Sequence, residues 1–200
     1  MSNFVKKVGI YGGTFDPIHN GHLRVIVELL SKKIVDQIIL IPAGEPRLRI
    51  EAPIADGQTR LEMCGLAIKD LPVELIEKVS VSDIEIKRSG PTYAIETVEE
   101  LVSSTKSELS ERTDVELFWI IGSDAYANID KWHRADELKE MVSFIIIDRP
   151  GTDANDGLDI DALDLSATQI RNDIGANNEI HGVSPSVRKF IAERKLYAGK

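Results

Sequence analysis

The chain has 200 residues, enough for one domain with a substantial core. Its 33 acidic and 24 basic side chains give a formal net charge of -9, which excludes a surface built as a whole for nucleic acid or anionic membrane. A phosphate-bearing small molecule can still bind through a local positive site. Cys64 is the only cysteine, so no internal disulfide forms. Because neither a signal-peptide pattern nor a long apolar window is visible, we expect a cytoplasmic protein.

Short apolar runs alternate with helical patterns along the chain. Runs rich in Val and Ile predict strands at Val8–Tyr11, Gln37–Pro42, Val79–Ile86, Glu116–Ile121 and Phe144–Asp148. Helical spacing predicts helices at Gly21–Ser31, Gln58–Lys69, Tyr93–Ser103, Asp136–Met141, Ala167–Ile174 and Pro185–Arg194. Such alternation is typical of βαβ units. The sequence therefore predicts an α/β, Rossmann-like fold with a doubly wound, mostly parallel sheet.

A polar, acidic stretch over residues 149–164 precedes a C-terminal helical part at about 165–200. Since no flexible linker separates the two, we expect residues 1–200 to form one domain. The segment DANDGLDID at 153–161 invites comparison with a calcium loop. Its Gly157 falls one position early for an EF-hand and no Glu ends it, so we expect a solvated loop.

The stretch GGTFDPIHNGH joins the first predicted strand to the helix after it. Gly12 and Gly13 permit a tight turn and a close approach of a ligand to the backbone. Ligands of parallel sheets bind outside the carboxyl ends of the strands, where the first amides and positive dipole end of a helix starting near Asn20 suit a phosphate. His19 and His22 project to roughly one side, and imidazoles can donate N–H bonds to a phosphate or become cationic. This pattern indicates anion recognition.

A plainer interpretation also exists, because a lone histidine near a helix start is more often a cap or a packed side chain. Two histidines after a glycine pair, at the mouth of a first strand, favour a functional site. The sequence contains no G-x-G-x-x-G of a dinucleotide fold and no G-x-x-x-x-G-K-[ST] of a P-loop. The site therefore belongs to another class of phosphate chemistry.

GGTFDPIHNGH resembles the signature of the nucleotidylyltransferase superfamily, whose H-x-G-H histidines lie against the phosphates of ATP or CTP. Further segments, in the family's order, resemble the bacterial nicotinate-mononucleotide adenylyltransferases: TRLEMCGLAI (59–68), DIEIKRSGPTYAIETVEEL (83–101), IIGSDAYANIDKWHRADEL (120–138), FIIIDRPG (144–151) and LSATQIRNDI (165–174). The resemblance spans essentially the whole chain. It implies adenylyl transfer from ATP to nicotinate mononucleotide in NAD biosynthesis, with Mg²⁺ bridging the triphosphate and held mostly by substrate oxygens and water.

The resemblance also implies roles for individual residues. The catalytic residues would be His19, His22 and Arg171. ATP would be bound by Gly12, Gly13, Thr14, Phe15, His19, His22, Asp124, Ser166, Thr168 and Arg171, with Asp124 on the ribose. The acceptor would be bound by Thr92, Tyr93, Ala94, Trp132 and His133, with the indole against the pyridine ring and nearby backbone amides on the nicotinate carboxylate.

On their own chemistry these later segments have structural interpretations too. Ser166 can be an N-cap, with Arg171 a solvated arginine inside the same helix. Asp124 can belong to a turn that follows a strand. Trp132 can be a core aromatic, although an exposed indole within NIDKWHRADE is a credible stacking platform.

The sequence departs from the family pattern at three places. Ala167 stands for the commoner second Ser of the S-[ST]-T-x-[IV]-R motif, and Ala94 stands for the usual Thr. The P-P-H-K segment of many members reads PAGEPRLRIEAP here, where Arg47 or Arg49 would supply the charge of the missing lysine.

Other functions therefore stay open. The acceptor can instead be nicotinamide mononucleotide or phosphopantetheine, and a non-catalytic nucleotide-sensing module is the alternative from another class. A class I aminoacyl-tRNA synthetase also uses an H-x-G-H site, but this short acidic chain has no K-M-S-K-S segment.

Overall fold

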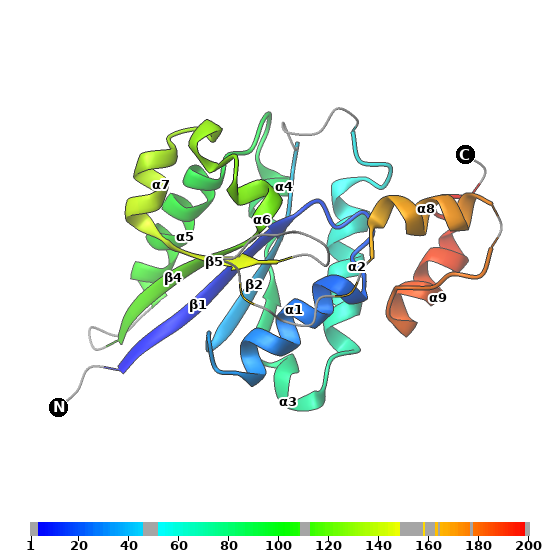
Figure 1. The fold of residues 1–200 in the computed structure, drawn as a ribbon, viewed down its shortest axis with the longest axis horizontal. Coiled ribbons are helices and arrows are strands. Elements are labelled where there is room, and N and C mark those ends of the chain that lie inside the picture. Colours follow the sequence, from blue (N-terminus) through cyan, green and yellow to red (C-terminus); the bar gives the residue numbers. More distant parts are fainter. Residues whose placement is uncertain are drawn as a thin grey trace.

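The structure is a computed structural model that describes residues 4–45, 52–108, 113–148, 158, 163, 165–176 and 178–198. Five strands form one parallel sheet in the order β3-β2-β1-β4-β5 (Figure 1). The strands are β1 (Phe4–Gly13), β2 (Gln37–Pro42), β3 (Val79–Val81), β4 (Thr113–Gly122) and β5 (Ser143–Ile147). This sheet confirms the predicted α/β, Rossmann-like class.

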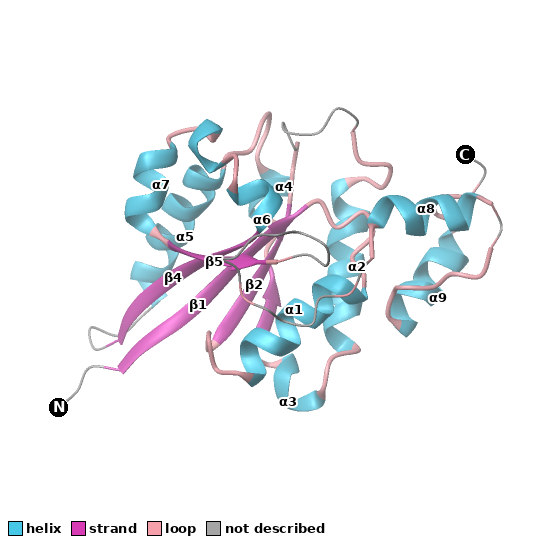
Figure 2. Cartoon of the chain, in the orientation of Figure 1, coloured by secondary structure: helices cyan, strands magenta, loops and turns pink. Residues whose placement is uncertain are grey.

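Helices cover both faces of the sheet (Figure 2). Those packed on one face are α1 (Asn20–Ser31), α2 (Gly57–Lys69), α3 (Val73–Ile76), α8 (Ala167–Gly175) and α9 (Pro185–Arg194). Those on the other are α4 (Ile84–Lys87), α5 (Ala94–Glu108), α6 (Ser123–Tyr126), the 3₁₀ turn η1 (Ile129–Lys131) and α7 (Ala135–Met141).

Each buried strand supplies residues to two cores. In β4, Trp119 and Ile121 face α5 and α7, whereas Ile120 faces α1 and α2. Along β2, Leu40 belongs to the core with α1 and α2, and Ile41 belongs to the core with α5 and α7. Successive side chains of a strand point to opposite faces, and a sheet covered on both sides needs apolar residues on both. The continuous apolar runs of the sequence follow from this arrangement.

The predicted strand Val79–Ile86 is wrong beyond Val81, because Ile84–Lys87 form helix α4. Alternating apolar residues continue through this segment, so its period alone does not reveal the change. The backbone amide of Ser82 donates to Leu40 O at 2.9 Å, which is the last bond of this segment to β2.

Strands β1 and β4 begin earlier than predicted, because Lys6 and Lys7 pair with Val115 and Glu116 beyond the apolar runs. The short helices α3, α4 and α6 and the η1 turn were missed, since three or four residues carry no measurable helical period. The other helices begin and end within a few residues of their predicted bounds.

Helices α8 and α9 lie at the side of α2 (Figure 1), and their apolar residues Ile170, Ile174 and Ile191 join the core beneath α1 and α2. Asp70, at the end of α2, accepts hydrogen bonds from the amide and hydroxyl of Ser186 at 2.8 and 2.7 Å. The start of α9 is thereby fixed to the end of α2.

Two sequence predictions concern segments outside the described residues. Arg47 and Arg49 both lie there, as does the acidic loop at 153–161 apart from Leu158, which forms an isolated bridge with Ile147. Across the part of the chain that is described, no helix combines the length and apolar character needed to cross a membrane.

Candidate active site

A cleft of about 1100 Å³ opens at the carboxyl ends of β1, β4 and β5. Strand β1 lies between β2 and β4, so β2 and β3 extend the sheet to one side of β1, and β4 and β5 extend it to the other. Such a reversal of strand order separates the connecting segments and leaves a crevice outside the strand ends, where ligands of open α/β sheets bind. The cleft is lined by every residue predicted to bind ATP or the acceptor except Arg171.

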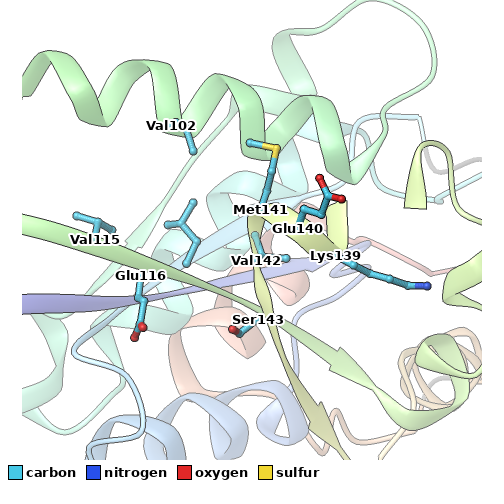
Figure 3. Close-up of a pocket in the computed structure, with 9 residues that line it drawn as sticks. Val102, Val115, Glu116, Lys139, Glu140, Met141, Val142 and Ser143 are labelled. Atoms are coloured by element: carbon cyan, nitrogen blue, oxygen red, sulfur yellow. The ribbon is translucent and has the colours of Figure 1, made fainter. Parts of the chain in front are cut away.

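A smaller pocket of about 270 Å³ lies at the opposite end of the sheet (Figure 3). Val115 and Glu116 near the start of β4, Ser143 at the start of β5 and Met141 at the end of α7 contribute to it. None of the predicted site residues lines this pocket. The predicted chemistry therefore belongs to the larger cleft.

His19 and His22 form a stacked pair at the start of α1. Their ring centroids lie 3.7 Å apart with an interplanar angle of 29°. His19 is the N-cap of α1, and its backbone amide donates to Nδ1 of His22 at 3.2 Å. Because this Nδ1 accepts a hydrogen bond, the proton of a neutral His22 ring is placed on Nε2. His22 can then donate a hydrogen bond from its opposite edge.

The glycine-rich loop, residues 12–16, is held in an unfavourable backbone conformation. Phe15 has a φ of 51°, in the left-handed region that an aromatic residue rarely adopts. Its ring is buried and packs edge-on against His22 at a centroid distance of 4.9 Å. The ring thus supports the histidine pair, and Phe15 offers a nucleotide chiefly its backbone.

Sequence reasoning missed Asp16 as a member of the site. Its carboxylate is 2% exposed and accepts hydrogen bonds from the amides of Ile54 and Ala55 at 2.8 and 3.1 Å. The Tyr197 hydroxyl donates to the same carboxylate at 2.7 Å, across a separation of 181 residues. Burial, together with this bond, raises the pKa of Tyr197, which therefore remains a neutral donor. No sequence pattern reveals so distant a pair.

Arg171 reaches the glycine-rich loop from α8 without lining the cleft. Its Nη1 donates to the backbone oxygen of Asp16 at 2.7 Å, and its Nη2 donates to Thr168 Oγ1 at 3.3 Å. Ser166 is the N-cap of α8, because its hydroxyl accepts from the Gln169 amide at 3.1 Å. The guanidinium therefore joins the start of α8 to the loop after β1.

Aromatic rings form the other half of the cleft. Trp132 is half-buried, and it meets Trp119 edge-on at a centroid distance of 6.2 Å. Tyr93 lies against His133 with ring centroids 4.3 Å apart. Flat ring surfaces beside a cleft suit an aromatic ligand.

Glu85 is a second residue that sequence reasoning missed, because its segment was predicted as a strand. The residue is 7% exposed and lines the aromatic half of the cleft. Thr97 donates to Glu85 Oε1 at 2.9 Å, and Arg88 Nη1 donates to the Thr97 hydroxyl at 3.3 Å. A carboxylate is therefore present close to the predicted acceptor residues.

Among the residues that the structure describes, no group of three or more His, Cys, Asp and Glu side chains could hold a metal ion. Asp16 in the cleft wall already accepts bonds from three protein donors. The residues present therefore fit a divalent cation whose ligands come mostly from phosphate oxygens and water.

Comparisons with known proteins establish the family. The family model described as Cytidylyltransferase-like matches residues 10–173. Two relatives, each named "Probable nicotinate-nucleotide adenylyltransferase", come from Acidothermus cellulolyticus and Frankia casuarinae. The Acidothermus protein is 37% identical, and the match covers 96% of this chain and 94% of that protein. The Frankia protein is 36% identical, and the match covers 94% of this chain and 98% of that protein. The chain belongs to the nicotinate-nucleotide adenylyltransferases of the cytidylyltransferase-like family.

A solved structure of the Plasmodium falciparum nicotinic acid mononucleotide adenylyltransferase, described as complexed with NaAD, has a TM-score of 0.76 with this chain. The two are 20% identical, and the match covers 96% of this chain and 97% of the other. This likeness confirms the fold, and the relatives confirm the predicted class of enzyme, a nucleotidyltransferase. Enzymes of the family generally use a divalent metal ion.

His22 provides the first test of the site. If its Nε2 donor stabilises charge that develops at a phosphate, His22→Ala should lower turnover by roughly 10²–10³-fold, as for the loss of one preorganised donor. Steady-state rates are measured together with circular dichroism of the purified variant. Turnover near that of the wild type in a normally folded variant would remove His22 from the mechanism.

Arg171 provides the second test. We expect Arg171→Ala to weaken ATP binding and lower turnover with every acceptor, and Arg171→Lys to restore neither fully, because lysine lacks the planar fork that spans two oxygens. Titration calorimetry with ATP and initial rates for both variants measure the effects. Unchanged ATP affinity and turnover in Arg171→Ala would show that the assignment is wrong.

Proposed function

We propose that this protein transfers the adenylyl group of ATP to nicotinate mononucleotide, forming nicotinate adenine dinucleotide and pyrophosphate for NAD biosynthesis. The observation that carries this proposal is the composition of the cleft. Its loop and helix start around Gly13 and His22 suit phosphates, and the aromatic residues Tyr93 and Trp132 line the same cleft. Similarity to named relatives over nearly the full chain supports the same reaction.

The reaction is a single in-line displacement. A phosphate oxygen of nicotinate mononucleotide attacks the α-phosphorus of ATP, and a new P–O bond forms. The bond from the α-phosphorus to the bridging oxygen breaks, and pyrophosphate leaves with the electron pair. Because both reactants are anions, catalysis depends mainly on positioning and on charge neutralisation at the pentacoordinate transition state.

The proposed roles follow the positions of the residues. His19 and His22 donate to phosphate oxygens at the start of α1, while Gly12, Gly13 and Thr14 approach the nucleotide through their backbone. At the start of α8, the residues proposed for the pyrophosphate portion are Ser166 and Thr168, which line the cleft, and Arg171, which does not line it and holds the loop at Asp16. Asp124, which follows β4, accepts from the nucleotide ribose.

We propose Mg²⁺ as the divalent ion, entering with ATP and neutralising part of the triphosphate charge. The general use of a divalent metal ion by enzymes of this family supports a cation in this role. We also treat residues 1–200 as one domain, since the family match reaches residue 173 and α9 packs on α2. The reaction is placed in the cytoplasm, where the free thiol of buried Cys64 would stay reduced.

One observation favours a second acceptor. The buried Glu85 carboxylate repels the carboxylate of nicotinate, and it accepts hydrogen bonds from a carboxamide. If the pyridine substituent pointed toward Glu85, nicotinamide mononucleotide would be preferred. The backbone amides near the pyridine ring that the family resemblance implies favour the acid instead; the Trp132 amide is not one of them, because it donates to Ile129 O at 2.9 Å.

Acceptor choice tests these alternatives. We expect pyrophosphate release with ATP and Mg²⁺ to be fastest with nicotinate mononucleotide, with a kcat/KM at least about tenfold above that for nicotinamide mononucleotide, or roughly 1.4 kcal/mol. Phosphopantetheine should give no product. Equal values for acid and amide would overturn the acid-specific assignment. ATP binding without pyrophosphate release, whichever acceptor is offered, would leave a nucleotide-sensing module.

Trp132 distinguishes stacking from core packing in the same assay. Trp132→Ala should raise KM for both mononucleotides to similar extents and leave ATP binding nearly unchanged, because the indole meets only the ring. Trp132→Phe serves as the matched control and should retain most of the affinity. An unaffected Trp132→Ala would return this residue to a purely structural role.

A further inference from the structure

Arg60, in the first turn of α2, is a buried cation that bonds only to backbone oxygens in the described structure. The residue is 2% exposed. Its Nε donates to Ala55 O at 3.1 Å, its Nη1 to Thr14 O at 2.7 Å, and its Nη2 to Ala43 O at 2.7 Å and Gly44 O at 3.4 Å. One guanidinium therefore holds three chain segments together.

Two of these segments flank opposite halves of the cleft. Thr14 belongs to the glycine-rich loop beside the histidine pair, and Ala43 and Gly44 form the loop after β2. At Gly44 an added Cβ would lie 2.2 Å from Glu85 O and 2.9 Å from Thr92 Cγ2, so this loop packs tightly on the acceptor half.

The planar guanidinium also determines which way the peptide groups of these loops face. In a trans peptide, C=O and the following N–H point in opposite directions. Because Thr14 O and Ala43 O point to buried Arg60, the N–H groups of Phe15 and Gly44 point away from it. Thr14, Phe15 and Ala43 line the cleft, so the peptide groups that Arg60 orients belong to the cleft wall.

We propose that Arg60 is a positioning residue that sets the separation and orientation of the two loops, and so aligns the acceptor phosphate with the α-phosphorus of ATP. This inference rests on the proposed adenylyl transfer. A direct bond joins the loops, from the Ala43 amide to Gly13 O at 2.8 Å, and Arg60 adds bonds to both. It also restrains the loop next to Phe15, whose left-handed φ of 51° needs support from its surroundings.

Positioning has a different kinetic signature from substrate binding. Each loop can still bind its own substrate when the other has shifted, but in-line attack requires both at once. Arg60→Lys keeps the charge and loses the fork that reaches separate carbonyls. We therefore expect kcat per folded active site to fall by roughly 10–100-fold, since a misplacement of about 1 Å costs up to 10²-fold. Dissociation constants for ATP and nicotinate mononucleotide, measured separately, should change less than about threefold.

The matched control is Ile191→Ala in α9, a buried position that packs toward α2 and lies outside the cleft. It should lower the denaturation midpoint while kcat per folded site stays that of the wild type. Folded sites are counted by calorimetric titration with ATP, and Arg60→Met provides a second variant without hydrogen-bond donors. Arg60→Met should be at least as slow as Arg60→Lys.

The possible outcomes distinguish a failure of the positioning role of Arg60 from a failure of the proposed adenylyl transfer. Loss of kcat per site with retained affinities supports positioning by Arg60. Unchanged kcat per site, or a loss explained by fewer folded molecules as in Ile191→Ala, would overturn it. A wild-type protein that makes no dinucleotide from ATP and nicotinate mononucleotide would instead overturn the proposed function, whatever the variants do.

Discussion

Two phosphate-bearing molecules repel each other, so a protein that joins them has to hold both at a fixed separation while neutralising their charge. The all-parallel sheet meets this requirement geometrically. The carboxyl ends of β1, β4 and β5 face one cleft, and the helix after β1 begins there with the histidine pair. The hydrogen-bond donors that suit phosphates and the aromatic rings therefore lie at the same edge of the sheet, although they come from distant parts of the sequence.

Charged and polar groups beneath the glycine-rich loop hold this edge together. Buried charges are costly unless hydrogen bonds satisfy them. Here Asp16 accepts from two amides and Tyr197, Arg60 donates to backbone oxygens, and Arg171 donates to the Asp16 backbone. The same bonds that satisfy these groups restrain the left-handed conformation of Phe15. Stability of the loop and preorganisation of the site therefore have a common origin.

The sequence predicted the parts of this protein that depend on local pattern. Continuous apolar runs such as those around Leu40 and Ile120 predicted buried strands, because both faces of the sheet are covered. GGTFDPIHNGH predicted the turn and helix start that carry His19 and His22. The strand prediction was wrong for residues 82–86, because the alternation of apolar and polar residues continues into helix α4.

Long-range contacts explain what local pattern could not provide. Arg60 lies in a segment that the sequence predicted as a helix and that resembles the family, but its carbonyl partners lie in three separate loops. Tyr197 contacts a carboxylate near the other end of the chain. The charged sequence neighbours of Trp132 do not reveal that Trp119 packs against it. Polar residues that are buried carry no periodic signal before the fold brings their partners together.

The central claim is that one cleft aligns both substrates for a single displacement at the α-phosphorus of ATP. The stereochemistry at that atom tests it most directly, using ATP made chiral at the α-phosphorus by a sulfur substitution and nicotinate mononucleotide as acceptor. Inversion of configuration in the dinucleotide product is the result that direct in-line transfer predicts. Retention would require two displacements through an enzyme-bound adenylyl group and would contradict this account.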